Sequence, residues 1–195
     1  TKPRSDGDQK YDSATFYSIS NCQEGLSRVT LGNFLIKRVV FEIQEELPNI
    51  KHFGTLSPIP GFRDWFSYLE DGKIKNILGD VPVENISFLK SPDLKVGDPR
   101  IVSNKVAITK LVAHYLMNEK DKKKLPINDV CRFHLGNGAI IDDIIINANV
   151  SEVGLNRSFG VMVNYLYELK NIEKNHEEYI NNKTIIVSDK LKKII

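Results

Sequence analysis

Ser57 lies where a strand-like segment, residues 50–56, runs into Pro58-Ile59-Pro60. The two prolines deny the backbone both a helix and a continuing central strand, so the chain must leave the sheet at this point. The end of a strand in an α/β sheet opens onto the crevice where ligands usually bind, which makes the serine hydroxyl a candidate for chemistry. The plainer alternative, which stays open, is a strand terminator whose serine only satisfies a turn.

His134 is the second candidate, and it stands shortly before Asn137-Gly138, a strong signal for a tight turn. The ordinary pKa of a histidine, about 6.5, lets the side chain give or take a proton at neutral pH, so it would supply an ionisable partner for Ser57. A hydrogen-bonded structural histidine is the alternative. The spacing forces no third member, so the sequence supports no hydrolase triad, and it does not show that the two residues meet.

A candidate anion site lies in residues 25–33, between the first strand-like segment and the first helix. A turn from strand to helix exposes backbone N–H groups at the positive end of the helix, which suits a phosphate or pyrophosphate. Gly32 permits close approach of a ligand, and Arg28 adds positive charge. An ordinary helix cap is the alternative. A phosphate-bearing ligand bound here would lie along the unit with its reactive end near Ser57.

The elements that must position these residues begin with a strand, a helix and a strand. Residues 14–20 are rich in β-branched and aromatic residues, which predicts a strand. Apolar residues at helical spacing predict a helix over about 31–47, closed by Pro48. With the strand at 50–56 these segments form a βαβ-like unit.

Helical spacing predicts three further helices: 62–69, 106–116 with Ser103 or Asn104 as its cap, and 161–174. Three segments have weaker patterns: 70–99 reads as a long polar excursion, 140–150 is ambiguous between helix and strand, and 171–182 reads as a solvated helix end or loop.

The composition predicts one soluble globular domain, because 195 residues with 41% hydrophobic and 27% charged residues are enough for a sizeable core. A net charge of +2, and a lysine run at 120–124 without interleaved aromatic residues, argue against a nucleic-acid-binding module. No apolar run is long enough for a membrane span. Cys22 and Cys131 make no disulfide framework and have no metal-ligand spacing with the four histidines, so a reducing compartment is expected.

Five segments, taken in order, carry a resemblance to a known family: Phe16-Tyr17-Ser18-Ile19-Ser20, Leu31-Gly32-Asn33-Phe34-Leu35-Ile36-Lys37-Arg38-Val39-Val40, Leu56-Ser57-Pro58-Ile59-Pro60-Gly61-Phe62, Phe133-His134-Leu135-Gly136-Asn137-Gly138-Ala139 and Gly160-Val161-Met162-Val163-Asn164-Tyr165-Leu166-Tyr167. They closely resemble the malonyl-CoA decarboxylases. The likeness runs with gaps from about residue 14 to about residue 167, and its ordered co-occurrence is more specific than any single motif.

The resemblance implies an α/β (α+β) fold of the acyl-CoA N-acetyltransferase-like type, a mixed sheet flanked by helices. Residues 1–13 are polar, contain Pro and Gly and show no period, which by itself predicts a flexible lead-in. The resemblance implies that 14–195 are the C-terminal part of the catalytic domain. The family's helical domain and the upstream strands of the catalytic domain would lie before this segment. Missing strands would leave an unpaired sheet edge and an incomplete core.

Carried over residue by residue, Ser57 matches the family's catalytic serine and His134 its catalytic histidine. Ser18 and Tyr167 match further active-site positions. The segment that binds the coenzyme A moiety corresponds to Ser27, Arg28, Val29, Thr30, Leu31, Gly32 and Asn33. Thr30 stands where the family has a glutamate, so the role of that carboxylate is absent or moved elsewhere.

The implied activity is that of a carboxy-lyase of fatty-acid metabolism, which converts malonyl-CoA to acetyl-CoA and carbon dioxide without a metal or organic cofactor, coenzyme A being part of the substrate. Ser57 would orient the malonyl carboxylate or thioester and His134 would donate the proton; the family usually describes the serine as proton acceptor and the histidine as proton donor. In an open alternative His134 polarises the thioester oxygen and water protonates the carbon.

Two other functions also stay open: an acyl-CoA-dependent acetyltransferase and a non-catalytic acyl-CoA-binding remnant. The expected partner is malonyl-CoA, and a homo-oligomer is not excluded. Family members occur in mitochondria, peroxisomes and cytoplasm. The end Leu191-Lys192-Lys193-Ile194-Ile195 is not a Ser-Lys-Leu-type peroxisomal address, and any mitochondrial presequence would precede residue 1.

Overall fold

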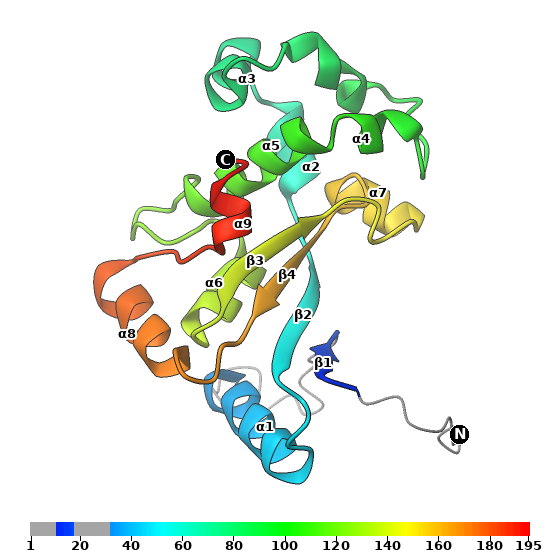
Figure 1. Ribbon diagram of the computed structural model, residues 1–195. Coiled ribbons are helices and arrows are strands. Elements are labelled where there is room, and N and C mark those ends of the chain that lie inside the picture. The colour runs from blue at the N-terminus through cyan, green and yellow to red at the C-terminus, as the bar shows by residue number, and fades with distance from the viewer. Residues whose placement is uncertain (1–10, 18–31) are drawn as a thin grey trace, which may run out of the picture.

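A computed structural model gives the fold of the chain, and it describes residues 11–17 and 32–195, with side chains from residue 36 onward in the second range. The described part contains a four-stranded mixed sheet flanked by helices (Figure 1). The strands are β1 (Ser13–Phe16), β2 (His52–Pro58), β3 (Ile140–Ile145) and β4 (Met162–Leu166), in the spatial order β1-β2-β4-β3.

The first half of the sheet is the predicted strand, helix, strand unit. β1 pairs in parallel with β2, and α1 (Gly32–Glu46) connects them, which confirms that prediction. β1 covers the first part of the predicted strand 14–20, whose last residues lie outside the described part of the chain. The register joins Phe16 to Thr55, so the chain leaves β1 at the end of β2 that carries Ser57.

β2 and β4 run antiparallel, and their alternation gathers hydroxyl groups on one face of the sheet. Along β2 the side chains of Phe53, Thr55 and Ser57 are buried, whereas the residues between them are less so. Tyr165 of β4 is paired with Thr55 and is also buried. Pairing continues past the end of β4, where the amide of Tyr167 donates to the Phe53 carbonyl at 2.7 Å.

The other helices are α2 (Phe62–Ser67), α3 (Asp71–Leu78), the 3₁₀ helix η2 (Val83–Lys90), α4 (Pro99–Ser103), α5 (Lys105–Met117), α6 (Asp129–Gly136), α7 (Glu152–Ser158), α8 (Ile172–Asn182) and α9 (Asp189–Lys192). The predicted helices at 31–47, 62–69 and 106–116 are confirmed as α1, α2 and α5. Asn104 is the residue that precedes α5, but its side chain makes no capping hydrogen bond.

The helix predicted over 161–174 is wrong. Residues 162–166 form β4, and α8 begins only at Ile172. The buried residues Val161, Val163, Tyr165 and Tyr167 recur with the period of a strand, and that alternation outweighs the helical spacing of the same apolar set. The ambiguous segment 140–150 begins as the strand β3. The segment 171–182 is the helix α8, whose inner face buries Ile172 and Tyr179.

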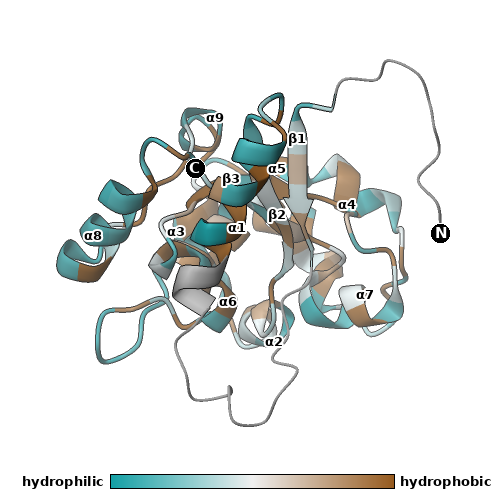
Figure 2. Ribbon diagram, turned by 90° about the horizontal axis from the view of Figure 1, so that it is seen from below, coloured by the Kyte–Doolittle hydropathy of each residue, from teal (hydrophilic) through white to brown (hydrophobic). Residues whose placement is uncertain are grey.

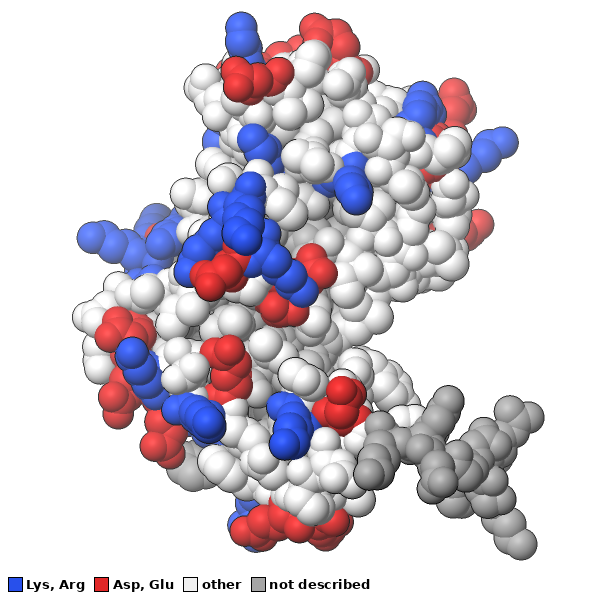
Figure 3. All heavy atoms as spheres, viewed as in Figure 1, with Lys and Arg blue, Asp and Glu red and all other residues white. Residues whose placement is uncertain are grey.

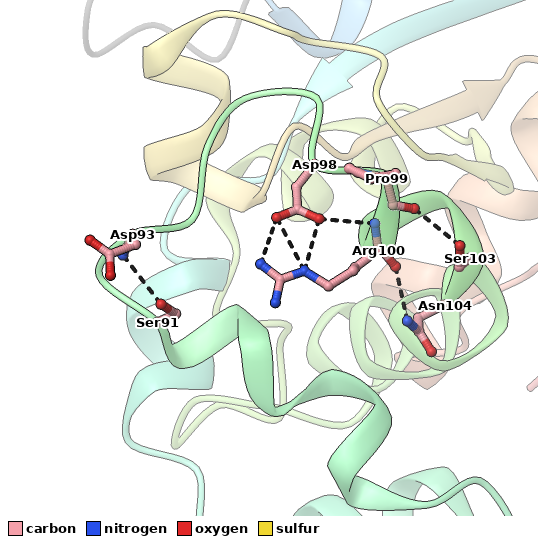
Figure 4. A network of polar contacts seen from close by, with 7 residues as sticks. All are labelled: Ser91, Asp93, Asp98, Pro99, Arg100, Ser103 and Asn104. Atoms are coloured by element: carbon pink, nitrogen blue, oxygen red, sulfur yellow. Dashed lines mark hydrogen bonds and ion pairs between the residues drawn. The ribbon is translucent and has the colours of Figure 1, made fainter.

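The polar excursion expected over 70–99 is also wrong, because α3, η2 and the start of α4 occupy it. Ile74, Leu78 and Ile86 in this stretch are fully buried and hold the short helices to the core. α4 begins at an ordered network, in which the Asp98 carboxylate accepts from the backbone N–H of Arg100 at 2.9 Å and from its guanidinium at 2.7 Å (Figure 4). This guanidinium lies over the Phe88 ring of η2, 4.7 Å from its centroid.

The core lies between the sheet and the helices around it. Figure 2 shows the hydrophobic segments gathered at the sheet and α5, whereas α8 at the periphery is mostly hydrophilic. α5 is the most apolar of these elements, with Ile108, Leu111 and Leu116 fully buried. None of the helices in the described part of the chain combines the length and the apolar character that crossing a membrane requires.

Candidate active site

Ser57 and His134 meet in the folded chain. The Ser57 Oγ atom lies 2.9 Å from His134 Nε2, although the two residues are 77 positions apart in the sequence. Both side chains are only 5% exposed. Ser57 is the last residue but one of β2, and His134 is in the last turn of α6. The structure therefore joins the two residues that sequence reasoning left as separate candidates.

The loop after Ser57 is held in place by hydrogen bonds to the Pro60 carbonyl. Pro58 ends β2, as the sequence predicts, and the Pro60 carbonyl then accepts two hydrogen bonds. One comes from the Asn128 side-chain amide at 2.9 Å and the other from the Tyr115 hydroxyl at 3.0 Å. Because Asn128 is also the N-cap of α6, the start of the helix is tied to the turn that follows Ser57.

The C-terminal end of α6 is fixed against α8. His176 Nδ1 lies 2.6 Å from the Gly136 carbonyl oxygen, and the Asn175 amide donates to the Gly138 carbonyl at 3.2 Å. Asn137-Gly138 ends a helix here, so the turn signal in the sequence marks a helix C-terminus, which also places His134 inside α6. Gly138 has φ +82°, and a Cβ atom there would clash with the Ile172 carbonyl.

The imidazole of His134 is enclosed by aromatic rings. The Tyr165 ring is stacked on it at a centroid distance of 4.3 Å and an interplanar angle of 21°, and the Phe133 ring meets it edge-on. Its second nitrogen, Nδ1, lies 2.8 Å from the Tyr167 hydroxyl. Burial lowers the pKa of His134 to about 4, so the ring is neutral at pH 7. Burial raises the pKa of Tyr167, so its phenol stays protonated.

Sequence reasoning missed Thr55 and Tyr165. Thr55 Oγ1 lies 3.0 Å from Ser57 Oγ in the buried interior. The signal for Thr55 was its position two residues before Ser57 on a strand, which places both side chains on one face. The signal for Tyr165 was the alternation of buried residues along β4, which the predicted helix obscured.

Of the remaining predicted site residues, the structure places only Tyr167 beside this pair. Ser18, Ser27, Arg28, Val29, Thr30 and Leu31 lie outside the described residues, and for Gly32 and Asn33 only the backbone is described. These two residues open α1, so the helix start expected at the end of the predicted anion-binding segment is present. Tyr167 alone among the further predicted positions is placed, and it contacts His134.

The described residues contain no group of three or more His, Cys, Asp or Glu that is arranged to hold a metal ion. Cys131, one helical turn before His134, is a buried thiol whose pKa burial raises to about 12. A pocket of about 280 Å³ between α3 and α5 includes Lys110 and His114 and none of the predicted site residues. Basic and acidic side chains are interspersed over the face seen in Figure 3.

Comparisons with known proteins agree on one family. The family model of the malonyl-CoA decarboxylase C-terminal domain matches residues 2–195. The mitochondrial malonyl-CoA decarboxylases of Rattus norvegicus and Anser anser anser are each 36% identical to the chain, over 93% and 94% of its length. The chain spans 40% of the length of each of these relatives.

Solved structures agree with the sequence comparisons. The crystal structures of malonyl-CoA decarboxylases from Rhodopseudomonas palustris and Agrobacterium vitis match the chain with TM-scores of 0.82 and 0.81, at 39% and 37% identity. Each match covers 93% of this chain, and 42% and 45% of the respective solved chains. The expected mixed sheet flanked by helices, of the acyl-CoA N-acetyltransferase-like type, is confirmed. The chain belongs to the malonyl-CoA decarboxylase C-terminal domain family.

Proposed function

We propose that this chain carries the reaction site of a carboxy-lyase that converts malonyl-CoA to acetyl-CoA and carbon dioxide, in fatty-acid metabolism. The observation that carries the proposal is the buried contact of 2.9 Å between Ser57 and His134, in a chain of the malonyl-CoA decarboxylase family. Among the three expected compartments, the names of the mitochondrial relatives favour the mitochondrion.

Decarboxylation makes two chemical demands on the site. Loss of carbon dioxide leaves an electron pair on the α-carbon, which the thioester stabilises as an enolate, and the carbon must then receive a proton. A buried hydroxyl beside a neutral imidazole offers hydrogen-bond donors in a place from which water is largely excluded. The reaction needs no covalent acyl-enzyme and therefore no triad acid, and we propose that no metal or organic cofactor takes part.

We propose that the coenzyme A moiety binds where β1 runs on toward α1. The chain leaves β1 beside the Ser57 end of β2 and re-enters the described structure at Gly32, the first residue of α1. The predicted coenzyme A segment, Ser27 to Asn33, lies in this stretch of sequence, and the start of α1 offers backbone N–H groups for a phosphate. Thr30, in place of the family's glutamate, would leave that position without a carboxylate.

The roles within the pair are proposals of the same kind. Ser57 would orient the malonyl carboxylate or thioester, and His134 would be the source of the proton. Because burial keeps the ring neutral at pH 7, a proton taken from it comes from the N–H of a neutral imidazole rather than from an imidazolium ion.

The test is formation of acetyl-CoA and carbon dioxide from malonyl-CoA by the natural full-length protein and by its Ser57→Ala and His134→Ala variants. Matched controls are Ser67→Ala and His114→Ala, which alter the same residue types on α2 and α5. The proposal expects turnover in the parent and both controls, and its loss in both site variants with the fold intact by circular dichroism. A folded parent that binds coenzyme A without turnover would contradict it and would favour a binding remnant.

A further inference from the structure

Four buried polar side chains form one line of hydrogen bonds through the site. Thr55 Oγ1 lies 3.0 Å from Ser57 Oγ, and Ser57 Oγ lies 2.9 Å from His134 Nε2. On the other side of the ring, His134 Nδ1 lies 2.8 Å from the Tyr167 hydroxyl. The four side chains are between 1% and 5% exposed, so each hydrogen they carry needs an acceptor within the protein or on a ligand.

The hydrogen bond to Tyr167 determines which nitrogen of the His134 imidazole carries the hydrogen. Among the described residues the Tyr167 hydroxyl has one partner, His134 Nδ1, and we assign that nitrogen as the acceptor, because a Tyr167 oxygen that accepted instead would leave the phenol hydrogen unpaired in the interior. An accepting Nδ1 carries a lone pair, so the single hydrogen of the neutral ring lies on Nε2. The lowered pKa of His134 agrees with one hydrogen on the ring instead of two. Nε2–H then donates to Ser57 Oγ.

The Thr55 end delivers a second hydrogen to the same atom. The only described partner of Thr55 Oγ1 is Ser57 Oγ, and we assign the threonine as the donor, because a threonine that accepted instead would leave its own hydrogen unpaired in the interior. A serine oxygen accepts two hydrogen bonds, and those from His134 and Thr55 fill both places. One hydrogen in the line is then without an acceptor among the described residues, and it is the hydrogen of Ser57 itself.

We propose that Thr55 and Tyr167 are positioning residues that orient the Ser57–His134 pair as a proton donor. Ser57 donates its hydroxyl proton to the substrate, and the Nε2–H group of His134 then reprotonates the Ser57 oxygen. This inference rests on the proposed decarboxylase function for the identity of the acceptor. It is the reverse of the hydrolase arrangement, in which histidine takes the serine proton and thereby creates a nucleophile.

In the proposed step, proton delivery follows the loss of carbon dioxide. The bond between the α-carbon and the carboxylate breaks, and its electron pair passes into the thioester enolate as carbon dioxide leaves. The Ser57 O–H bond then breaks as a new C–H bond forms at the α-carbon, and the Ser57 oxygen takes the proton of His134 Nε2. The negative charge left on the imidazole is stabilised by the Tyr167 O–H at Nδ1. One proton from solvent water restores Nε2–H, so the net reaction consumes one proton.

The nitrogen-15 NMR spectrum of histidine-labelled protein at pH 7 tests this polarity without any turnover, because protonated and unprotonated ring nitrogens have separate shifts. A His134→Gln sample identifies the signals of His134 among those of the four histidines. We expect Nε2 to be protonated and Nδ1 unprotonated, and Tyr167→Phe to transfer part of the hydrogen to Nδ1. Protonation of Nδ1 in the parent would overturn the proposal, whatever the enzyme turns over.

Turnover then tests the role of Thr55. We expect Thr55→Val to lower kcat about tenfold, the loss expected from one neutral hydrogen bond, with KM little changed. Thr55→Ser, which keeps the hydroxyl, should restore kcat, and Thr109→Val, at a buried threonine of α5, should match the parent. Equal rates for Thr55→Val and Thr55→Ser would contradict the role of Thr55. A parent with the expected ring state but no turnover would count against the proposed function instead.

Discussion

Asn128 and Pro60 join the two elements of the site: the Asn128 amide donates to the Pro60 carbonyl at 2.9 Å, while its oxygen caps α6 by accepting from the Cys131 N–H at 2.8 Å. One buried side chain thus connects the turn that follows Ser57 with the helix that carries His134. The distance between the catalytic candidates depends on this connection as well as on the sheet.

Asn128→Ala removes both hydrogen bonds from a residue that is 2% exposed. We expect it to lower the free energy of unfolding by about 1–3 kcal/mol, because a helix cap is lost and the Pro60 carbonyl loses a donor. Asn128→Asp keeps the capping oxygen but has no N–H for Pro60. Urea denaturation of both variants measures how much the helix cap and the hydrogen bond to Pro60 contribute to the free energy of unfolding. A stability of Asn128→Ala equal to that of the parent would contradict the role of this connection, whereas the loss in Asn128→Asp also contains the repulsion between its carboxylate oxygen and the Pro60 carbonyl.

Gly138→Ala should damage the fold behind His134. Gly138 has φ +82°, which alanine adopts only with strain, and the added Cβ would run into the Ile172 backbone where α8 meets α6. We expect a loss of roughly 2 kcal/mol or more, measured by thermal unfolding. Gly72→Ala is the matched control, since Gly72 is an exposed position of α3 with open space around it, and alanine there should be neutral or stabilising.

Acid should destabilise the protein through His134. Burial holds the pKa of this imidazole at about 4 in the folded chain, whereas the unfolded chain has its ordinary value of 6.5. Between these values the unfolded state binds the proton and the folded state does not. The stability contribution is therefore complete above about pH 6.5 and falls as the pH drops toward 4, by roughly 3 kcal/mol in total.

Denaturant titrations of the parent and of His134→Gln, at pH 7 and pH 4.5, check this pH dependence. The parent should lose more stability between the two pH values than the variant, by most of the amount attributed to His134. Equal losses in the two proteins would show that the imidazole is not held neutral by burial.

Tyr165 should matter through its ring. It is stacked on the His134 imidazole at 4.3 Å and limits how that ring turns. We expect Tyr165→Leu to lower kcat about tenfold and Tyr165→Phe to stay near the parent, because phenylalanine keeps the stacked face. Steady-state turnover of malonyl-CoA measures both variants. A Tyr165→Leu enzyme as active as the parent would show that the stacked ring does not contribute to turnover.

How far the site could be predicted depends on how local each signal is. The exit of the chain after Ser57 follows from Pro58 and Pro60, whose effect on the backbone is local, and the structure ends β2 there. The helices at 31–47 and 106–116 are long and periodic, and such patterns survive in almost any tertiary context. The sequence alone had no means of placing Ser57 beside His134, because that contact depends on packing between distant elements.

The two wrong predictions, a helix at 161–174 and a polar excursion at 70–99, also arise because packing between distant elements decides the structure there. Residues 161–167 satisfy both a helical and a strand period, and their pairing with β2 and β3 decides in favour of the strand. Reading them as a helix concealed that Tyr165 and Tyr167 share the sheet face of Ser57 and Thr55. In the segment 70–99 the apolar residues are interspersed with polar and turn-forming ones, so the short helices there become evident only from what they bury.

The most direct measurement of the central claim is a double-mutant cycle on malonyl-CoA turnover, with Ser57→Ala, His134→Ala and the double variant compared with the parent. If the two residues act as one proton-delivering unit, each single change should remove nearly all activity, and the double variant should be no slower than the slower single variant. Rate losses that multiply in the double variant would contradict the account, because Ser57 and His134 would then contribute independently.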